Sequence, residues 1–244
     1  MKTLLYTISD FKEDAIDCIR MMRNSISDNN FDFAIIATKK IDCEYEIIVD
    51  ESVDNYIGFL KYSPKVPTGY DQYIYLDSDI LFFGPISSFY SNQEFSIVFE
   101  DLKMNSLCSA GKFWFKYPHD SSESYTHNIE NLYGINAGSF AFKNTSFLSN
   151  VRFFFEKFKL NDILSNAILE QSSFNYALCI QNNFDFSKCL DFTNKAVIHA
   201  KPNSFNIDKK LYHFNGFTNG MIHKKEIMKK FIDENKNRIT QIIQ

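Results

Sequence analysis

The stretch that decides the fold of this 244-residue chain is Tyr73-Ile74-Tyr75-Leu76-Asp77-Ser78-Asp79-Ile80-Leu81-Phe82-Phe83-Gly84-Pro85-Ile86. An apolar strand runs into two carboxylates one residue apart, continues as an apolar segment and stops at Gly-Pro. Burying unpaired carboxylates is strongly unfavourable, so a cation is expected beside them. Because side chains two apart on an extended chain point the same way, we predict that Asp77 and Asp79 face one divalent ion, which can hold an anion such as a diphosphate.

The position of the acid pair matters more than the tripeptide itself. In open α/β sheets, ligands collect beyond the carboxyl ends of the strands. The alternative interpretation is a strand-terminating turn with solvated carboxylates, since about one Asp-x-Asp is expected by chance in such a chain. The apolar residues at 73–76 and 80–83 favour a ligand site, because a surface turn does not need them.

Composition narrows the class of protein. The hydrophobic content of 45% and charged content of 23% are ordinary for a globular chain, with a core rich in its 26 Phe and 13 Tyr. A net charge of −4 argues against nucleic acid as a partner, because phosphate-backbone binding usually needs a basic face. Five cysteines without C-x-x-C spacing, and no recognisable signal peptide, predict reduced thiols and a cytoplasmic location.

The first hundred residues alternate between strand and helix patterns. Besides the strand that carries the acids, strands are predicted at 4–8, 31–38, 45–49 and 95–99, and helices at 11–23 and 53–62. Ser9 or Asp10 is predicted to cap the first helix. This alternation predicts an α/β fold whose mainly parallel central sheet is flanked by helices in three layers.

The remaining residues extend the same domain. Residues 101–131 are interpreted as irregular, followed by a strand at 133–142, helices at 147–160 and 162–180, short strands at 197–198 and 211–212, and a basic helix from Lys224. No repeat, low-complexity tract or Pro/Gly-rich linker divides the chain. We therefore predict a single domain over residues 1–244.

Three further clusters place polar residues in unusual positions. Asn136-Ala137-Gly138-Ser139 interrupts an apolar strand, which either a close approach of a ligand to the backbone or a β-bulge would explain. Gln171 and Asn175 share one face of a predicted helix, next to Glu170, although an ordinary solvated face has the same pattern. His213 ends a short apolar strand before a glycine turn, as either a metal ligand or a half-buried structural histidine.

In their order along the chain, these features resemble glycosyltransferase family 8, a group of nucleotide-sugar enzymes with the GT-A fold. The resemblance spans most of the chain. It rests on Phe59-Leu60-Lys61-Tyr62, on Tyr75-Leu76-Asp77-Ser78-Asp79-Ile80 for the family's Y-L-D-x-D signature with Gly84-Pro85-Ile86 after it, on Ile135-Asn136-Ala137-Gly138 for its F-N-S/A-G strand, on Glu170-Gln171 with Asn175 for its D-Q-x-x-x-N helix, and on His213-Phe214-Asn215-Gly216 for its H-F-x-G turn.

The resemblance implies a set of site residues. Asp77, Asp79 and His213 would hold Mn²⁺ or Mg²⁺, with Asp79 and His213 favoured as direct ligands. Asn136, Glu170 and Gln171 would be catalytic: Asn136 would contact the donor sugar, and Glu170 and Gln171 would flank the anomeric carbon. The nucleotide sugar would be bound by Thr7, Ile8, Asp10, Lys61, Asp77, Ser78, Asn136, Ala137, Gly216 and Lys224.

The implied function is a metal-dependent, retaining hexosyltransferase that moves a sugar from a nucleotide sugar, a UDP-sugar by family habit, to a glycan or other hydroxyl acceptor. On this interpretation about residues 1–100 form the nucleotide-binding half and about 101–223 the acceptor and catalytic half. Residues 224–244 form the C-terminal basic helix.

Two alternatives stay open at this stage. A degenerate GT-A domain that binds a nucleotide sugar or glycan without turnover is favoured by Ser172, which stands where many members carry an acid, and by the absence of K-P-W after the histidine turn. A nucleotidyltransferase would need a Gly-rich basic loop after the first strand. Residues 9–12, Ser-Asp-Phe-Lys, do not form one.

The C-terminal basic helix has two interpretations. A basic amphipathic helix can lie on an anionic membrane surface, which would give a weak membrane contact. The favoured alternative is a helix that packs on the domain and leaves its lysines in water.

Overall fold

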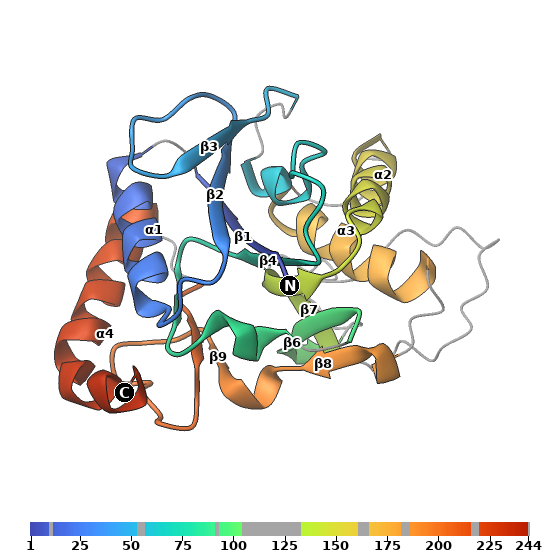
Figure 1. Cartoon of the computed structure of the whole chain (residues 1–244). Coiled ribbons are helices and arrows are strands. Elements are labelled where there is room, and N and C mark those ends of the chain that lie inside the picture. The colour runs from blue at the N-terminus through green and yellow to red at the C-terminus, as the bar shows by residue number, and fades with distance from the viewer. Residues whose placement is uncertain are drawn as a thin grey trace.

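A central sheet runs through the molecule, with helices on both sides (Figure 1). The computed structural model describes residues 1–9, 12–52, 57–90, 93–103, 133–160, 166–181, 186–215 and 220–243. Within them the sheet has seven strands in the order β3-β2-β1-β4-β7-β6-β8. The strands are β1 (Thr3–Ile8), β2 (Asp32–Ala37), β3 (Glu46–Val49), β4 (Gln72–Leu76), β6 (Phe95–Lys103), β7 (Tyr133–Phe142) and β8 (Cys189–Asp191).

The sheet is mainly parallel, as predicted. Strands β3, β2, β1 and β4 run parallel to one another, and β6 runs parallel to β8. Strand β7 is antiparallel to both of its neighbours, β4 and β6. The parallel strands are apolar along their length because both faces of the sheet are covered. The strand order reverses between β1 and β4, because β2 and β3 lie on one side of β1 and β4 lies on the other, and α/β proteins bind ligands at such a place.

The next strand after β4 belongs to a second, smaller sheet. It consists of β5 (Ile80–Phe82), β10 (Leu211–His213) and β9 (Ala196–Ile198), with β10 in the middle. Strand β10 is antiparallel to β5, so that His213 lies opposite Ile80. The acid pair therefore occupies the crossing between the two sheets, and β10 brings a residue from far along the chain to that crossing.

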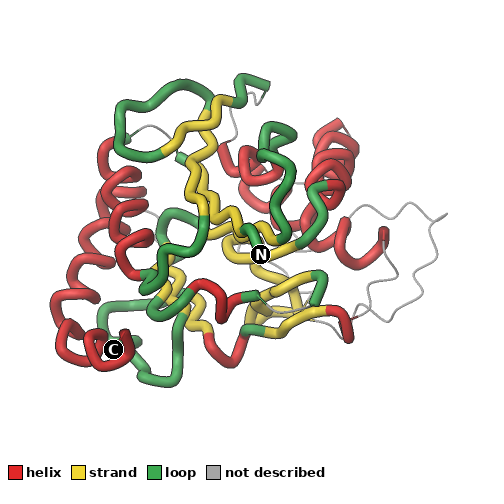
Figure 2. Tube along the Cα trace, viewed as in Figure 1, coloured by secondary structure: helices red, strands yellow, loops and turns green. Residues whose placement is uncertain are grey.

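The helices form layers on the two faces of the main sheet. Helices α1 (Glu13–Ser25) and α4 (Gly220–Ile243) lie side by side on one side, and α2 (Ser146–Leu160) and α3 (Asn166–Gln181) on the other (Figure 2). The short 3₁₀ helices are η1 (Ile57–Tyr62), which contacts α2 and β1, and η2 (Ile86–Phe89), η4 (Phe186–Lys188) and η5 (Thr193–Lys195). Between sheet and helices lies an aromatic core that includes Tyr62, Phe140 and Phe174.

Some local predictions were wrong. The N-cap of α1 is Lys12, which makes no side-chain capping hydrogen bond, whereas the backbone N–H of Ser9 donates to Ile36 in β2. Ser9 thus continues the pairing of β1 with β2, and the helix has its N-cap three residues later, at Lys12. In the described part of the predicted helix 53–62 the structure has a 3₁₀ helix, which ends before Ser63-Pro64 because proline disfavours the helical conformation of the residue before it. Strand β6 extends to Lys103, into the segment predicted to be irregular.

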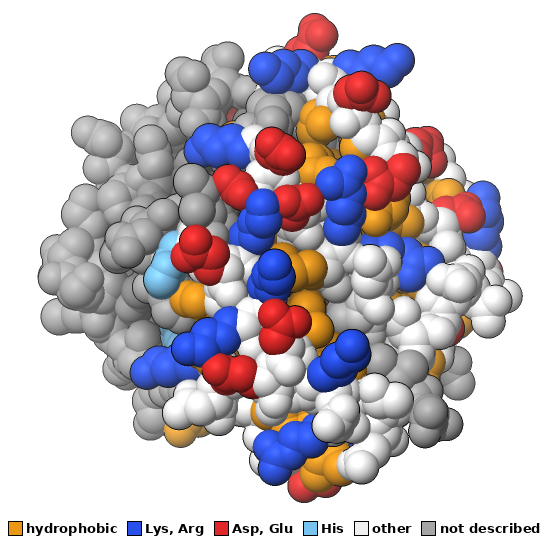
Figure 3. Space-filling view, turned by 90° about the vertical axis from the view of Figure 1, so that its left-hand side faces the viewer, with side chains coloured by type: hydrophobic (Ala, Val, Ile, Leu, Met, Phe, Trp, Pro, Cys, Tyr) orange, Lys and Arg blue, Asp and Glu red, His pale blue; other side chains and the backbone are white. Residues whose placement is uncertain are grey.

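Helix α4 packs on the domain, which is the favoured of its two interpretations. Its buried Met228 and Phe231 join a core cluster with Leu81 and Tyr212. Figure 3 shows that acidic and basic side chains are interspersed on this side of the molecule. Lys225, for example, pairs with both Asp14 and Asp17 of α1. This mixed face lends no support to contact with an anionic membrane, and none of the described helices has the length and apolar character needed to span one.

Candidate functional site

The two acids lie in a tight turn rather than on an extended chain. Strand β4 ends at Leu76, and the backbone N–H of Ile80 donates to the carbonyl oxygen of Asp77 at 3.1 Å. The N–H of Asp77 donates to Gly138 O in β7 at 2.7 Å. The argument from extended geometry was therefore wrong. Turn geometry and the neighbouring strands bring the two carboxylates together instead.

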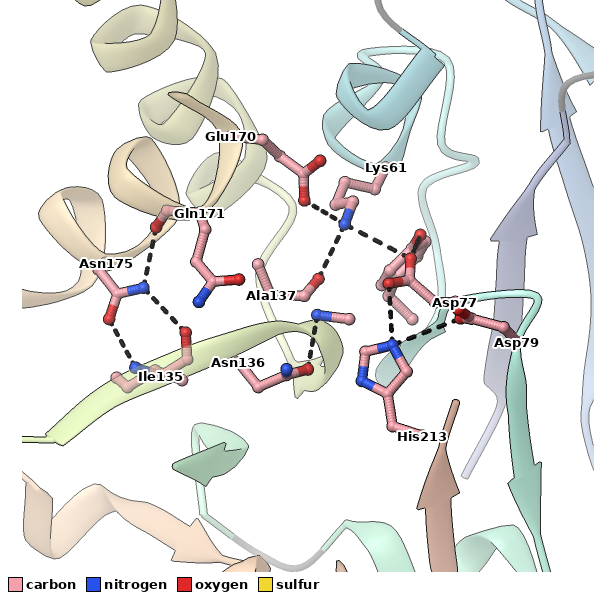
Figure 4. Close-up of polar contacts among 12 residues, drawn as sticks. Lys61, Asp77, Asp79, Ile135, Asn136, Ala137, Glu170, Gln171, Asn175 and His213 are labelled. Carbon is pink, nitrogen blue, oxygen red and sulfur yellow. Dashed lines mark hydrogen bonds and ion pairs between the residues drawn. The ribbon is translucent and has the colours of Figure 1, made fainter. Parts of the chain in front are cut away.

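His213 completes a cluster with the two acids. Its Nε2 lies 3.5 Å from Asp77 Oδ2 and 3.4 Å from Asp79 Oδ1 (Figure 4). One potential ligand atom from each of the three residues lies within 4.8 Å of the others. The His213 and Asp79 side chains are each 4% exposed and that of Asp77 is 26% exposed, so the cluster opens to solvent on the Asp77 side.

Two lysines hold the other carboxylate oxygens. Lys61 Nζ lies 3.5 Å from Asp77 Oδ1 and donates to Ala137 O at 3.0 Å, and it also pairs with Glu170. Lys224, in the first turns of α4, pairs with Asp79 Oδ2. Each carboxylate thus directs one oxygen to a lysine and the other to His213.

The charges in this cluster shift one another's protonation. Burial raises the pKa of a carboxyl group, but Lys61 and His213 hold the pKa of Asp77 below its usual value, and His213 and Lys224 do the same for Asp79. Burial lowers the pKa of His213, but the Asp79 and Asp77 carboxylates outweigh it and raise this pKa to about 9. Without a metal ion, an imidazolium therefore lies between two carboxylates at neutral pH.

Gly138 explains why the β7 cluster contains a glycine. A Cβ atom at this position would lie 2.3 Å from His213 Cε1 and 2.6 Å from Asp77 Oδ2. Glycine is the one residue without a Cβ, so only glycine allows β7 to pass this close to the cluster. The strand is also bulged here, because the register between β6 and β7 shifts between Ile97 and Phe99. The register shift agrees with the β-bulge interpretation of the Asn-Ala-Gly-Ser segment, and the close approach of a ligand to this backbone stays a prediction.

The residues at this crossing fit a divalent ion. Two carboxylates and one imidazole suit Mn²⁺ or Mg²⁺, with the nitrogen ligand favouring the former. Their ligand atoms already converge, and the space that a Cβ of residue 138 would fill is kept open beside them. Asp77 Oδ2, Asp79 Oδ1 and His213 Nε2 are the atoms that would hold the ion.

The affinity of this cluster for Mn²⁺ is expected to rise with pH. Metal binding requires neutral His213, whose pKa is about 9 in the free protein, whereas both carboxyl groups are already ionised. Each bound ion therefore displaces about one proton, and the affinity should rise about tenfold per pH unit between pH 6 and 8.5. Calorimetry in buffers of different ionisation enthalpy measures both the number of protons released and the Mn²⁺ affinity. Equal affinity at both ends of this range would contradict the assignment of His213.

A second group of polar residues connects β7 with α3. Asn175 accepts from the N–H of Ile135 at 2.7 Å and donates to Ile135 O and to Gln171 O, each at 2.8 Å (Figure 4). Asn136, the next residue of β7, accepts from Gly138 N at 2.9 Å and donates to Glu100 at 2.5 Å. These contacts fix the predicted catalytic strand and helix relative to each other.

Residues of both groups line one cleft of about 320 Å³. Most of the predicted site residues are among its walls: Ile8, Lys61, Asp77, Ser78, Asp79, Asn136, Glu170, Gln171, His213 and Lys224. The walls also include residues for which no role was predicted: Ala15, Ile57, Gly58, Gly138 and Asn215. The cleft therefore gathers side chains that are up to 216 positions apart, from Ile8 to Lys224.

Four predicted binding residues have a different status. Thr7 and the side chain of Ala137 are buried and do not line the cleft, although the carbonyl oxygen of Ala137 accepts from Lys61. Asp10 and Gly216 lie outside the described residues. The predicted contacts of these four residues with a nucleotide sugar stay predictions.

Sequence reasoning missed Glu100. This residue of β6 accepts from Asn136 and lies 3.5 Å from Gln171 Nε2, with His199 Nε2 4.0 Å from its other oxygen. The available signal was a carboxylate directly after the apolar residues 95–99, the same pattern that singled out Asp77. His199 carries the positive φ of 58° that is rare outside glycine.

Comparisons with known proteins identify the fold. No protein-family model and no curated protein sequence matches the chain. Solved structures do match. The galactosyltransferase LgtC, solved with donor and acceptor sugar analogues, superposes with a TM-score of 0.54 at 10% identity, over 98% of this chain and 100% of that one.

Two further structures agree. The apo-form glycosyltransferase GlyE of Streptococcus pneumoniae TIGR4 has a TM-score of 0.53 at 12% identity, over 98% of this chain and 64% of that one. The apo bifunctional glycosyltransferase WbbM has a TM-score of 0.53 at 13% identity, over 99% of this chain and 51% of that one. The chain thus spans less than two thirds of these two proteins. It has the GT-A fold of glycosyltransferases, as its sequence predicted.

Proposed function

We propose that this protein is a metal-dependent, retaining glycosyltransferase that moves a hexose from a nucleotide sugar, with a UDP-sugar favoured, to a glycan or other hydroxyl acceptor. The observation that carries this proposal is the convergence of Asp77, Asp79 and His213 in a cleft of a GT-A fold. The resemblance to family 8 and the glycosyltransferases among the similar structures support it. The coarser part of the proposal, glycosyl transfer, depends on the fold and cleft together.

The donor end of the cleft supplies positive charge. When bound by Asp77, Asp79 and His213, Mn²⁺ or Mg²⁺ would act as a Lewis acid toward the donor diphosphate. Lys224 lines the same cleft, and its ammonium group is within reach of an anion beside Asp79. We infer that Lys224 binds the diphosphate and neutralises it as it leaves. Ile8, at the end of β1, belongs to the part of the cleft expected to hold the nucleoside.

The opposite wall supplies the polar groups for the sugar. Asn136 and Gln171 both contact Glu100, and Glu170 is oriented by its ion pair with Lys61. We infer that Asn136 hydrogen-bonds the donor sugar and that Glu170 and Gln171 flank its anomeric carbon. The acceptor oxygen would then form the new glycosidic bond on the side from which the nucleoside diphosphate departs, with loss of the hydroxyl proton.

One observation favours a second candidate, a GT-A domain that binds a nucleotide sugar or glycan without turnover. Lys61 and Lys224 already balance the charges of Asp77 and Asp79, so the cluster is electrostatically satisfied without a metal ion. Ser172, which occupies a position that many family members fill with an acid, is fully buried and does not line the cleft. The two candidates differ in whether ligand binding needs the metal.

Titration calorimetry separates the two candidates. UDP, UDP-glucose, UDP-galactose, GDP and GDP-mannose are each titrated into the protein with Mn²⁺ and with a chelator. We expect uridine nucleotides to bind at least 10-fold more tightly with Mn²⁺, because the ion links the carboxylates to the diphosphate. Equal affinity with and without Mn²⁺ would favour the domain without turnover. A failure of all five compounds to bind would refute the proposed transferase, and of the second candidate it would leave only a domain that binds a glycan.

A further inference from the structure

Asp77 Oδ1, the outer oxygen that points away from His213, has a second partner besides Lys61. The phenol of Tyr75, two residues earlier on β4, donates a hydrogen bond to Asp77 Oδ1. Tyr75 is fully buried, so this hydroxyl does not exchange its partner with solvent. Lys61 Nζ lies 3.5 Å from the same oxygen. The oxygen that points away from His213 is therefore fixed by two donors.

The ring of Tyr75 is held on several sides. It contacts Tyr6 of β1 at a centroid distance of 5.3 Å and stacks on Phe140 of β7 at 5.0 Å. Lys61 Nζ lies 5.0 Å from the centroid of the Tyr75 ring, in the range of a cation–π contact. Because neighbours from both flanking strands confine the ring, its hydroxyl has a defined position beneath the Asp77 carboxylate.

A fixed outer oxygen determines the direction of the inner one. With Oδ1 held by Tyr75 and Lys61, Asp77 Oδ2 is directed toward His213 Nε2 at 3.5 Å. A carboxylate without such contacts can rotate about its Cβ–Cγ bond, or offer both oxygens to one ion. Hydrogen bonds to the free oxygen of a ligating carboxylate are a recognised way of tuning metal affinity.

We propose that Tyr75 is a positioning residue that holds Asp77 as a one-oxygen ligand of the divalent ion. This inference depends on the metal site of the proposed function. The role belongs to the hydroxyl group and not to the ring, so replacement by phenylalanine should preserve packing and impair metal binding.

Strand β4 provides a matched control. Tyr73 lies two residues earlier and therefore on the same face of the strand. It too is buried, and it stacks on Phe142 at 5.1 Å much as Tyr75 stacks on Phe140. Its hydroxyl accepts from Tyr70 N at 3.3 Å and contacts none of the three proposed ligands. Tyr73→Phe therefore removes a buried tyrosine hydroxyl without touching the metal site.

The experiment measures Mn²⁺ affinity of the full chain by calorimetry and by electron paramagnetic resonance, with the metal alone and with UDP. Tyr75→Phe is expected to weaken Mn²⁺ binding 10- to 100-fold, the range seen when a hydrogen bond to a ligating residue is removed. Tyr73→Phe is expected to bind Mn²⁺ like the wild type. Urea denaturation of both variants shows whether each is folded at the temperature used.

The outcomes are distinct. Equal Mn²⁺ affinity of Tyr75→Phe and Tyr73→Phe would overturn the inference while leaving the metal site intact. Failure of the wild type to bind Mn²⁺, with or without UDP, would instead refute the proposed function. If Tyr75→Phe does not fold, 3-fluorotyrosine inserted at position 75 keeps the ring and the hydroxyl but makes the phenol more acidic. At least a twofold change in Mn²⁺ affinity would then support the inference, and an unchanged affinity would overturn it.

Discussion

Replacement of Asp79 by alanine is expected to abolish metal-dependent glycosyl transfer. The variant lacks the oxygen that faces His213 and the partner of Lys224, so Lys224 loses its buried counter-charge and His213 loses one of two. We expect a rate loss of at least about 10³-fold, since loss of metal-ion stabilisation removes several kcal/mol from the transition state. The rate is measured as the release of UDP when UDP-glucose or UDP-galactose transfers its sugar to an acceptor or to water.

The same variant tests the alternative without turnover. Breaking a buried ion pair is expected to reduce the free energy of unfolding by about 3 kcal/mol, so activity is compared below the unfolding transition. Asp233→Ala, an exposed carboxylate in the later part of α4, is the matched control and should be fully active. Nucleotide binding by Asp79→Ala with the affinity of the wild type would mean that ligand binding does not depend on a metal ion in this cluster.

Substitution of Gly138 by alanine is expected to impair the site through a single added carbon. The new Cβ would lie 2.3 Å from His213 Cε1 and 2.6 Å from Asp77 Oδ2, distances that real Cβ atoms do not show. The His213 ring, which is buried between two carboxylates, must move away from them to make room for the new atom. We expect Mn²⁺ affinity to fall at least about 10-fold. Overpacking should lower the free energy of unfolding by about 1–3 kcal/mol.

Gly69 is the appropriate comparison for Gly138. It has a φ of +91°, and a Cβ at this position would meet no atom within 4 Å. Gly69→Ala therefore strains the backbone without crowding any neighbour, and it should lose stability while keeping the Mn²⁺ affinity of the wild type. If Gly138→Ala also binds Mn²⁺ like the wild type, His213 can leave its observed position without consequence and is not a ligand.

The elements of the fold were largely predictable because their signals are local. The apolar runs of β1, β2 and β4 identify buried parallel strands, and their alternation with helices implies a layered α/β sheet. The predictions failed where a tertiary contact overrode the local signal. Ser9 has the chemistry of a helix cap, but the sheet takes up its backbone N–H through Ile36, and α1 begins later.

The residue types of the candidate site were predictable, but the contacts between its side chains were not. An acid pair at a strand end, a glycine inside a strand and a histidine before a glycine turn each stood out in the sequence. Which of these side chains contact one another could not be predicted, because the contacts of Asp77 and Asp79 with His213 and Lys224 span as many as 145 positions. Glu100 had the same local pattern as Asp77, yet only the fold shows that it contacts Asn136.

The sequence by itself determined the class of fold and the chemical character of the site. Hydrophobic periodicity and acids within an apolar stretch can both be recognised from residues that are close together in the chain. Tertiary structure alone decided which carboxylate oxygen faces His213 and which faces a lysine, because those directions depend on the crossing of two sheets. It also decided that a turn, and not an extended strand, joins Asp77 to Asp79. Side-chain direction at such a crossing is set by packing between distant segments, which leaves no periodic trace in the chain.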